Sequence, residues 1–359
     1  MSHSTGIVKN YYREMREFKS FFINRCMVTK KYEAHKLWAH WLIRILCKNG
    51  VNHHLIPNKS AINDKEIVDH LKLLGIDDEQ CISQFYSQII DKLNQLFDSY
   101  NDPKLAQLHD KNQMSDFSNS IHVEKQCKNG KNYVMYKLDE IYVKYQTTTH
   151  SVLIERYVGD INLRNFYMFE MGYNYYILDG YSLQWCIPPK SLQILEKSLF
   201  LKTELFASPI NAYLPSYYSL FNVDKMFGAI DNFFVADLST VDNGVYEVNP
   251  PFIEYVFVES SLKIVNMLEI SQRKSNSLMF IYVMPGWFDS KGYQILKNSP
   301  FMMDEIVLPE KNHFYYHCDK NKLIVANFET HVLLLGTSTS KNLWTPKIKS
   351  EFIDNYTHY

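Results

Sequence analysis

The sequence lacks a strong charge of either sign, because 38 Lys and Arg residues nearly balance 39 Asp and Glu residues and leave a formal net charge of -1. No global basic field attracts nucleic acid, so any such binding must rest on a local patch. No run approaches the roughly 18 apolar residues of a membrane span, and no secretory segment follows the polar start. We expect no membrane partner and a soluble, intracellular protein of the nucleus or cytoplasm, including a viral factory if its origin is viral.

Several chemical signatures are also missing. The six cysteines include no C-x-x-C pair, which favours reduced intracellular thiols over a disulfide framework or a zinc site. The sequence contains no G-x-G-x-x-G, no G-x-x-x-x-G-K-[ST] and no H-E-x-x-H motif, so the dinucleotide, nucleoside triphosphate and metalloprotease sites of those types are set aside. We expect no metal ion.

What is present begins with helical periodicity. The chain has 359 residues, of which 46% are hydrophobic, enough for two domains. Apolar residues recur at three- and four-residue steps over 34–45, and Asn49-Gly50 is a plausible end of that helix. Asn63 and Glu66 form a weak capping box before a short helix that Gly75 would close. A longer amphipathic helix is expected over residues 82–97.

The composition changes after these helices. Over residues 104–131 it shifts to Asn, Ser, Gln, Asp and Lys, which is typical of a linker. Short stretches rich in aromatic and β-branched residues follow at 133–138, 141–145 and 151–157, and we expect them to be strands. Arg156, Arg164 and Lys144 could contact phosphates in this region, although charges on exposed strand faces are usually only solvated.

The stretch with most chemical content is Asn249-Pro250-Pro251-Phe252. A strand-like run precedes it and a helix-like run follows, so it would lie at the carboxyl end of a strand, where open α/β sheets bind ligands. The prolines fix φ and supply no N–H, which keeps the turn rigid. The tetrapeptide resembles motif IV of the amino-group methyltransferases that use S-adenosylmethionine. In that role Asn249 Oδ1 and the Pro250 carbonyl accept the two hydrogens of an adenine amine, and Phe252 stacks on the base; the alternative is an ordinary strand-to-turn junction.

A second stretch lies about 40 residues earlier, where an expected strand ends in Phe206-Ala207-Ser208-Pro209. Methyltransferases usually carry a glycine-rich motif at this place. Here the small Ala207 and Ser208 would let the backbone approach the methionine moiety of the cofactor. Asp237 ends the apolar run 233–238, which we expect to be a strand, and its carboxylate could accept hydrogen bonds from the ribose hydroxyls or the adenosine of the cofactor.

Together these residues resemble the phosphorylated-CTD-interacting-factor family, the cap-specific adenosine N6-methyltransferases. The resemblance covers roughly residues 180–346 and is weaker over the helical part. It is carried by Phe206 to Asn211, Phe227-Gly228, Glu247 to Phe252, Phe280 to Trp287, His331 to Leu335 and Trp344-Thr345-Pro346. The sequence departs from the family in Pro285 to Phe288, which lacks charged neighbours around the tryptophan, and in having no WW domain before the helical part, which removes the basis for binding a phosphorylated polymerase tail.

The resemblance implies an α/β protein in which a helical domain, residues 1–130, precedes a Rossmann-like S-adenosylmethionine-dependent methyltransferase domain, residues 131–359. The implied reaction methylates N6 of (2′-O-methyl)adenosine at the first transcribed nucleotide, next to the 7-methylguanosine cap, so the partner is capped RNA. The catalytic residues would be Asn249, Pro250, Pro251 and Phe252. The residues on the cofactor side would be Glu204, Phe206, Ala207, Ser208, Pro209, Asn211, Asp237 and Asn249.

The residues leave alternatives open. The same tetrapeptide serves adenine N6-methyltransferases of internal RNA or of DNA, and glutamine side-chain amide methyltransferases use Asn-Pro-Pro with an aromatic residue. A non-catalytic RNA-binding relative is a further alternative. A cationic 7-methylguanine calls for aromatic faces, and the sequence does not choose among Tyr173, Tyr175, Tyr176, Trp185, Trp287, Tyr315 and Tyr316.

Overall fold

The computed structural model describes residues 3–28, 30–49, 66–100, 111–178, 184–239, 241–318 and 321–358. The chain forms two compact units, residues 1–181 and residues 182–359. Within the described ranges, no helix is long and apolar enough to cross a membrane.

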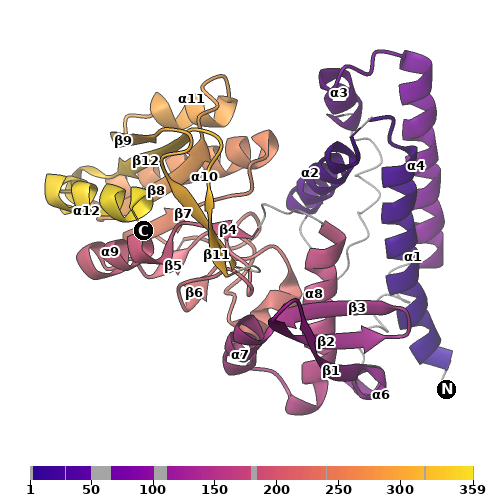
Figure 1. Ribbon diagram of the computed structural model, residues 1–359. Helices are drawn as coiled ribbons and strands as arrows, with labels where there is room; N and C mark the ends of the chain where they lie inside the picture. Colours follow the sequence, from indigo (N-terminus) through magenta and orange to yellow (C-terminus); the bar gives the residue numbers. More distant parts are fainter. Residues whose placement is uncertain are drawn as a thin grey trace. The chain divides into compact units, whose positions relative to one another are not determined.

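The first unit begins with helices, as predicted. Aromatic side chains from three of them form its core, with Phe22 stacked on Trp41 at 5.4 Å between ring centroids and Phe85 edge-on to Phe22 at 5.4 Å. Gly75 has a φ of +80°, a conformation that favours glycine, and lies just after the short helix that it was expected to close. The capping residue Asn63 lies outside the described residues. The helices are α1 (His3–Arg25), α2 (Lys31–Asn49), α3 (Glu66–Leu73) and α4 (Glu79–Ser99) (Figure 1).

A three-stranded antiparallel sheet and further helices complete this unit. Two predictions were wrong here. Residues 111–128 are not part of a linker, and residues 151–157 lie mostly in a helix, of which Leu153 is the buried residue. The linker prediction failed because β1 is exposed along most of its length and is therefore polar. The strand prediction over 151–157 failed because the β-branched residues at 152 and 154 are accommodated in a helix. The elements are α6 (Lys111–Ser120), β1 (His122–Lys128), β2 (Lys131–Leu138), β3 (Ile141–Gln146), α7 (Thr147–Arg156), a 3-10 turn (Ile161–Leu163) and α8 (Arg164–Leu178).

The division of the chain therefore lies near residue 181 rather than at the expected residue 130. Packing explains the difference. The hydroxyl of Tyr145 on β3 donates to the carbonyl of Met168 on α8 over 2.5 Å. A Cβ atom at Gly172 on the same helix would meet the Tyr145 side chain at 2.1 Å, so this close approach requires glycine. The three strands thus share a core with the helices of the first unit.

The second unit is built on a six-stranded mixed sheet with the order β6-β5-β7-β8-β12-β9. Strands β6, β5, β7 and β8 are parallel, while β12 is antiparallel to both β8 and β9. A second sheet of three short strands has the order β11-β10-β4. The strands are β4 (Trp185–Cys186), β5 (Thr203–Glu204), β6 (Ser216–Tyr217), β7 (Gly244–Val248), β8 (Leu278–Pro285), β9 (Met302–Leu308), β10 (Phe314–His317), β11 (Lys322–Val325) and β12 (Thr330–Gly336).

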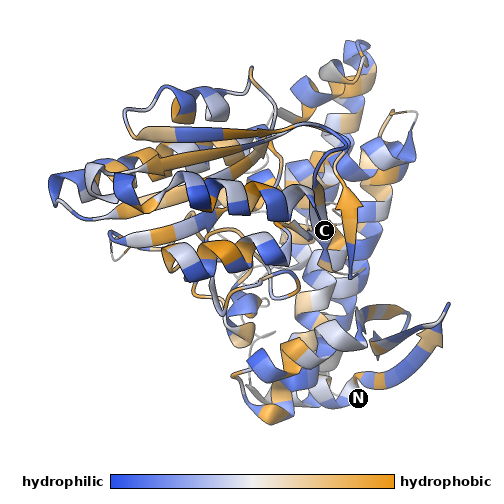
Figure 2. Ribbon diagram, turned by 60° about the vertical axis from the view of Figure 1, so that its left-hand side comes forward, coloured by the Kyte–Doolittle hydropathy of each residue, from blue (hydrophilic) through white to orange (hydrophobic). Residues whose placement is uncertain are grey.

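Helices cover both faces of the large sheet. Strand β8 alternates as expected for a strand buried on both sides: Ile281 and Val283 pack in a cluster with α9 (Pro189–Leu199) and α12 (Pro346–Thr357), whereas Phe280 and Tyr282 pack with α10 (Glu254–Arg273) and α11 (Lys291–Lys297). Several strands of the second unit carry long stretches coloured hydrophobic (Figure 2). Two 3-10 segments, Asn222–Phe227 and Ser338–Leu343, complete the unit. This is an α/β unit of the predicted class.

Candidate active site

The order of the strands reverses direction at β5. From β5 the chain moves to β6 on one side and later returns to β7 on the other side, from which it continues to β8. In an open α/β sheet, ligands bind outside the carboxyl ends of the strands at such a reversal. Residues 205–208 follow β5 and residues 249–252 follow β7. The two predicted stretches therefore leave adjacent strands at the place where this kind of sheet binds ligands.

The register fixes how these two stretches meet. Glu204 on β5 is paired with Glu247 on β7, and the Leu205 N–H donates to the Glu247 carbonyl over 2.8 Å. Phe206 and Asn249 each come two residues after the paired glutamates. Both loops therefore begin at the same level of the sheet edge.

The turn after β7 presents unused acceptors. The Ile253 N–H donates to the Pro251 carbonyl over 2.7 Å, and Ile253 is the N-cap of α10. Within the described part of the chain, neither the side chain of Asn249 nor the carbonyl of Pro250 takes part in a hydrogen bond. Asn249 is half-buried and Pro250 is buried. The turn is thus fixed by its prolines and by the start of α10, while these two oxygens make no hydrogen bond within the described chain.

Phe252 lies where the two core clusters of the second unit meet. Its half-buried ring is edge-on to Phe328 at 5.7 Å and to Trp287 at 6.5 Å between centroids. Phe328 is in turn parallel to Trp185, with an interplanar angle of 9° and a centroid distance of 6.5 Å. All four rings are partly exposed. They form a group of aromatic faces next to the Asn249 turn, suited to a flat ligand.

The turn after β5 is held by side chains. The Asn211 Oδ1 atom accepts from the Ser208 N–H over 2.6 Å, and the Ser208 hydroxyl lies 2.7 Å from Gln184 Oε1 and 2.9 Å from Asn211 Oδ1. All three residues are buried. Ser208 and Asn211 therefore shape the loop that carries Phe206, Ala207 and Pro209. Gln184, which lies 24 residues before Ser208, was not predicted to take part in the site.

The carboxylate of Glu204 is hydrogen-bonded to the backbone. Its Oε2 atom accepts from the Leu214 N–H over 2.6 Å and so closes the connection between β5 and β6. Its neighbour Glu247 is fully buried, and its Oε2 atom has no hydrogen-bond partner among the described residues. Burial, followed by the nearby charge of Glu204, raises the pKa of Glu247 well above its ordinary value. Glu247 is thus a buried acid two residues before Asn249, and no role was predicted for it from the sequence.

Asp237 lies in a loop, so the strand expected over residues 233–238 was wrong. The ammonium of Lys263 on α10 donates to the carbonyls of Phe233, Phe234 and Ala236 at 2.6, 3.2 and 3.4 Å. These bonds satisfy the backbone groups that a strand would have paired. The loop packs against the site, because Phe233 lies 4.8 Å from Phe206 between ring centroids. The exposed carboxylate of Asp237 accepts from the Ser239 N–H over 2.9 Å, and this bond is the main reason that its pKa is lowered.

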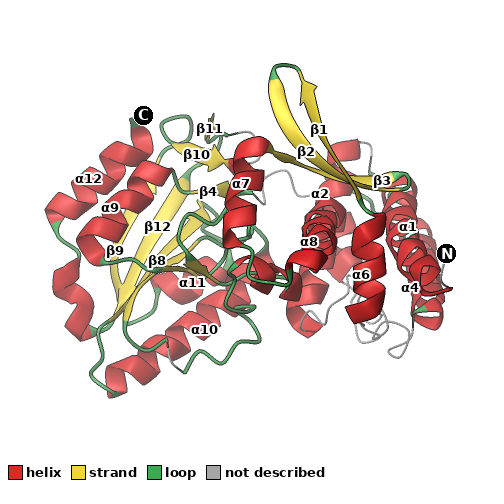
Figure 3. Cartoon of the chain, turned by 90° about the horizontal axis from the view of Figure 1, so that it is seen from below, coloured by secondary structure: helices red, strands yellow, loops and turns green. Residues whose placement is uncertain are grey.

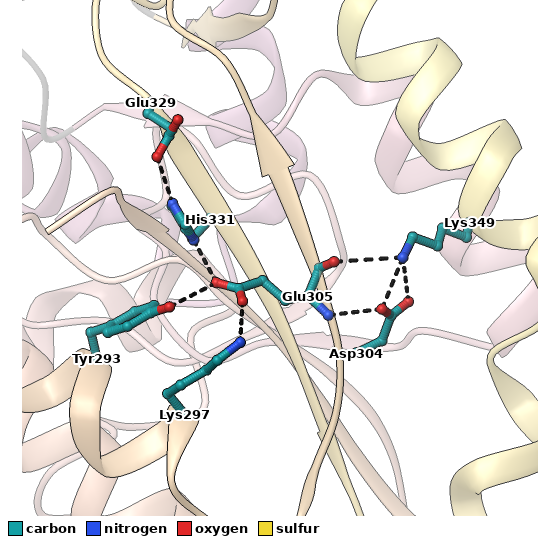
Figure 4. Close-up of polar contacts among 7 residues, drawn as sticks. All are labelled: Tyr293, Lys297, Asp304, Glu305, Glu329, His331 and Lys349. Atoms are coloured by element: carbon teal, nitrogen blue, oxygen red, sulfur yellow. Dashed lines mark hydrogen bonds and ion pairs between the residues drawn. The ribbon is translucent and has the colours of Figure 1, made fainter. Parts of the chain in front are cut away.

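A network of polar side chains lies next to the carboxyl end of β8. His331 is buried, and its two ring nitrogens lie 2.5 Å from Glu305 Oε1 and 2.8 Å from Glu329 Oε1 (Figure 4). The Gly286 N–H donates to the Glu329 carbonyl over 2.8 Å, and a Cβ atom at Gly286 would lie 3.0 Å from the Glu329 carboxylate. This network therefore holds the segment that leads from Pro285 to Trp287, one of the rings beside Phe252.

The aromatic candidates for a cap-binding face separate clearly. Tyr173 is fully buried in the first unit, and its hydroxyl donates to the Tyr12 carbonyl, so it offers no face to a ligand. Tyr315 is also buried, with its hydroxyl 2.9 Å from the Thr330 hydroxyl. Trp185 and Trp287 are partly exposed and belong to the aromatic group around Phe252. Phe328 belongs to the same group and was not among the aromatic residues predicted from the sequence.

Comparison with known proteins identifies a family for this chain. The family described as Phosphorylated CTD interacting factor 1 WW domain matches residues 137–318, about half of the chain. The chain belongs to this family. The matched part of this CTD-interacting-factor family member runs from β2 to the end of β10 and includes both loops of the candidate site.

Two curated relatives agree with the family assignment. Each is called mRNA (2'-O-methyladenosine-N(6)-)-methyltransferase, and they come from Mus musculus and Homo sapiens. Each is 27% identical to this CTD-interacting-factor family member over 187 residues. The aligned residues make up 50% of this chain but only 26% of each relative, so the chain matches about a quarter of their length.

Proposed function

We propose that this protein transfers a methyl group from S-adenosylmethionine to N6 of the adenosine that begins a capped transcript, with the 2′-O-methylated nucleotide as substrate. The observation that carries the proposal is the turn of residues 249–252. It lies at the strand-order reversal of the sheet, and Asn249 and Pro250 keep two acceptor oxygens free of hydrogen bonds within the described chain. The names of the relatives support the choice of a cap-adjacent adenosine.

The chemistry of the amine explains why two acceptors are needed. The lone pair of an exocyclic adenine amine is delocalised into the ring, so the amine is a weak nucleophile. Asn249 Oδ1 and the Pro250 carbonyl accept its two hydrogens and thereby orient the nitrogen. Phe252 holds the flat base by stacking, as aromatic side chains hold unpaired bases. The rest of the catalysis is positioning, since orientation alone removes a large part of a barrier.

The residues after β5 fit the proposed cofactor. When bound, S-adenosylmethionine supplies an activated methyl group on its sulfonium. Ala207 and Ser208 have small side chains that permit close approach of the backbone. Phe206, with Phe233 and Phe234, offers apolar faces for an adenine ring. Asp237 is exposed and can accept from hydroxyl groups, while Glu204, Ser208 and Asn211 hold the loop by the hydrogen bonds described above.

Transfer of label from S-adenosylmethionine to short RNAs tests this function. Four RNAs that begin with adenosine are compared, with and without a 7-methylguanosine cap and with and without the 2′-O-methyl group. We expect incorporation on capped RNA and the highest rate on the capped, 2′-O-methylated RNA, with no added metal ion. Equal labelling of capped and uncapped RNA would instead assign the protein to adenines of internal RNA, and labelling of none of them would contradict an RNA methyltransferase.

A further inference from the structure

The three-stranded sheet of the first unit has two chemically different faces. On β3, Ile141, Val143 and Tyr145 are buried, whereas Tyr142 and Lys144 between them are exposed. Tyr145 and Val143 face α8, where Gly172 contacts both. Since side chains alternate along a strand, Tyr142 and Lys144 mark the opposite face. We call it the outer face; residues paired across the strands share it.

The outer face is rich in lysine. The register places Lys128 directly opposite Lys131, and Lys137 opposite Tyr142, while Lys144 shares the same face. All four lysines are exposed. The outer-face strand residues are His122, Glu124, Gln126, Lys128, Lys131, Tyr133, Met135, Lys137, Tyr142, Lys144 and Gln146, of which only Glu124 is acidic. A local positive patch thus exists on a chain whose net charge is -1.

Two lysines are paired at the turn end of the β1–β2 hairpin. Like charges directly opposite each other destabilise a pair of strands. Lys128 and Lys131 flank the turn of Asn129 and Gly130, both of which have positive φ. The turn end of the ribbon projects away from the helices of its unit, where these residues are exposed (Figure 3). These two lysines therefore place positive charge at the exposed end of the β1–β2 hairpin.

Aromatic rings lie between the lysines. Tyr142 is 52% exposed and is the register partner of Lys137. The Lys144 ammonium lies 5.4 Å from the centroid of the Tyr133 ring. Lysines that contact phosphates and aromatic rings that stack on bases are the combination by which proteins bind single-stranded nucleic acid without sequence preference. Bases paired in a duplex do not offer their faces in this way.

We propose that the outer face binds a single-stranded segment of the RNA substrate, beyond the nucleotide that is methylated. The choice of RNA rests on the proposed function; the single-stranded, sequence-independent mode rests on the lysines and tyrosines of this face. Lys128, Lys131 and Lys144 contact phosphates, and Tyr133 and Tyr142 stack on bases.

The test measures binding of the full chain to a labelled, uncapped, single-stranded 20-nucleotide RNA by fluorescence anisotropy at several salt concentrations. We expect the triple variant Lys128→Gln, Lys131→Gln, Lys144→Gln to bind at least about tenfold more weakly at low salt. Its plot of log affinity against log salt should be flatter by about 2, because each phosphate contact to a single strand contributes roughly 0.7 to the slope. Tyr142→Leu should weaken binding without changing the slope.

The matched control makes the same charge change at exposed lysines of the second unit, Lys202→Gln, Lys341→Gln, Lys347→Gln. Its affinity should equal that of the wild type; an equal loss in both triple variants would overturn the assignment of the outer face. The Lys128 and Lys131 substitutions should also leave the melting temperature unchanged or raised, which separates a binding defect from unfolding.

Methylation of short and long capped RNAs separates RNA binding by the outer face from the proposed methyl transfer. The variant should methylate a capped tetranucleotide as fast as the wild type and a capped 30-nucleotide RNA more slowly. If no RNA is methylated but the variant still loses RNA binding, the proposed function fails and the binding face stands. If the variant binds single-stranded RNA as the wild type does, or loses affinity only for duplex RNA, the single-strand assignment is overturned.

Discussion

Glu204 and Glu247 are register partners on adjacent parallel strands, and both are buried directly before the loops of the candidate site. The carboxylate of Glu204 is held by the Leu214 N–H, whereas Glu247 Oε2 has no hydrogen-bond partner among the described residues. Burial and the neighbouring charge raise the pKa of Glu247. This arrangement favours one charged and one neutral carboxyl group, as is usual where two carboxyl groups share a buried place.

The raised pKa of Glu247 predicts a pH dependence of stability. A carboxyl group whose pKa is higher in the folded state stabilises the fold fully below its unfolded pKa, near 4.5, and loses this contribution as the pH rises toward the folded value. Glu247→Gln removes the titration. We expect the unfolding free energy of the variant, relative to the wild type, to improve with rising pH by up to about 1.4 kcal/mol per pH unit in that window. Denaturant unfolding from pH 4 to pH 9 measures it.

Glu305→Gln serves as the control with the opposite sign. Burial raises the pKa of Glu305, but hydrogen bonds from Lys297, His331 and Tyr293 outweigh it and leave the pKa lowered. Its stabilising contribution is therefore present above about pH 4.5 and is lost as the pH falls through the folded value. The Glu305 variant should differ most from the wild type at neutral pH and least in acid. Parallel pH profiles for the two variants would refute the assigned protonation of Glu247.

Asn249→Ala should abolish most of the methyl transfer without unfolding the protein. The substitution removes one of two acceptors for the amine hydrogens, and loss of one well-placed group of this kind costs on the order of 100-fold or more in rate. Single-turnover transfer to capped RNA measures the effect. Asn243→Ala is the matched control, since Asn243 is exposed at the amino end of the same strand. Unchanged transfer in the Asn249 variant would remove this residue from the reaction.

Phe252→Leu should weaken the hold on the base. Leucine keeps apolar bulk beside Phe328 and Trp287 but has no flat face, and stacking of a base on an aromatic ring is worth about 1–3 kcal/mol. We expect kcat/KM for RNA to fall about 5- to 150-fold, while cofactor affinity stays constant. Phe200→Leu, at a 75% exposed phenylalanine, provides the comparison. A wild-type rate in the Phe252 variant would show that Phe252 does not contact the base.

Lys263→Met should weaken binding of S-adenosylmethionine. The ammonium of Lys263 donates hydrogen bonds to carbonyls of the loop from Phe233 to Ala236. The ring of Phe206 packs against Phe233 in this loop. Hydrogen bonds to a charged group are worth about 1.5–3 kcal/mol, so we expect affinity for S-adenosylmethionine to fall about tenfold or more. Calorimetric titration measures it. Lys274→Met, which removes only a surface pair with Asp242, should bind the cofactor normally; equal affinity in both variants would contradict the role of Lys263.

The parts that could be predicted from the sequence are those that depend on local pattern. The apolar run of β7, the proline pair and the amphipathic α10 follow one another without interruption, so the place of Asn249 at a strand end was predictable. The family resemblance singled out the runs 280–287 and 331–335, which overlap the buried strands β8 and β12. Each is a continuous apolar run with helices on both faces of its sheet.

The errors arose where distant residues decide the structure. Residues 233–238 are as apolar as a strand, but Lys263, far along the chain, satisfies their carbonyls in a loop. Strand β1 is polar because the ribbon is exposed, so its composition resembled a linker. The support of Ser208 by Gln184, and of Leu214 by Glu204, depends on tertiary contacts that no local pattern reports.

The position of the transferred methyl group shows directly whether the protein methylates N6 of the cap-adjacent adenosine. Capped RNA that begins with 2′-O-methyladenosine and contains further adenosines is incubated with the protein and deuterated-methyl S-adenosylmethionine, digested to nucleosides and analysed by mass spectrometry. We expect deuterated methyl on N6 of the first adenosine, none on internal adenosines, and none after Asn249→Ala. Deuterated methyl on internal adenosines, or on the first nucleotide at a position other than N6, would contradict this expectation.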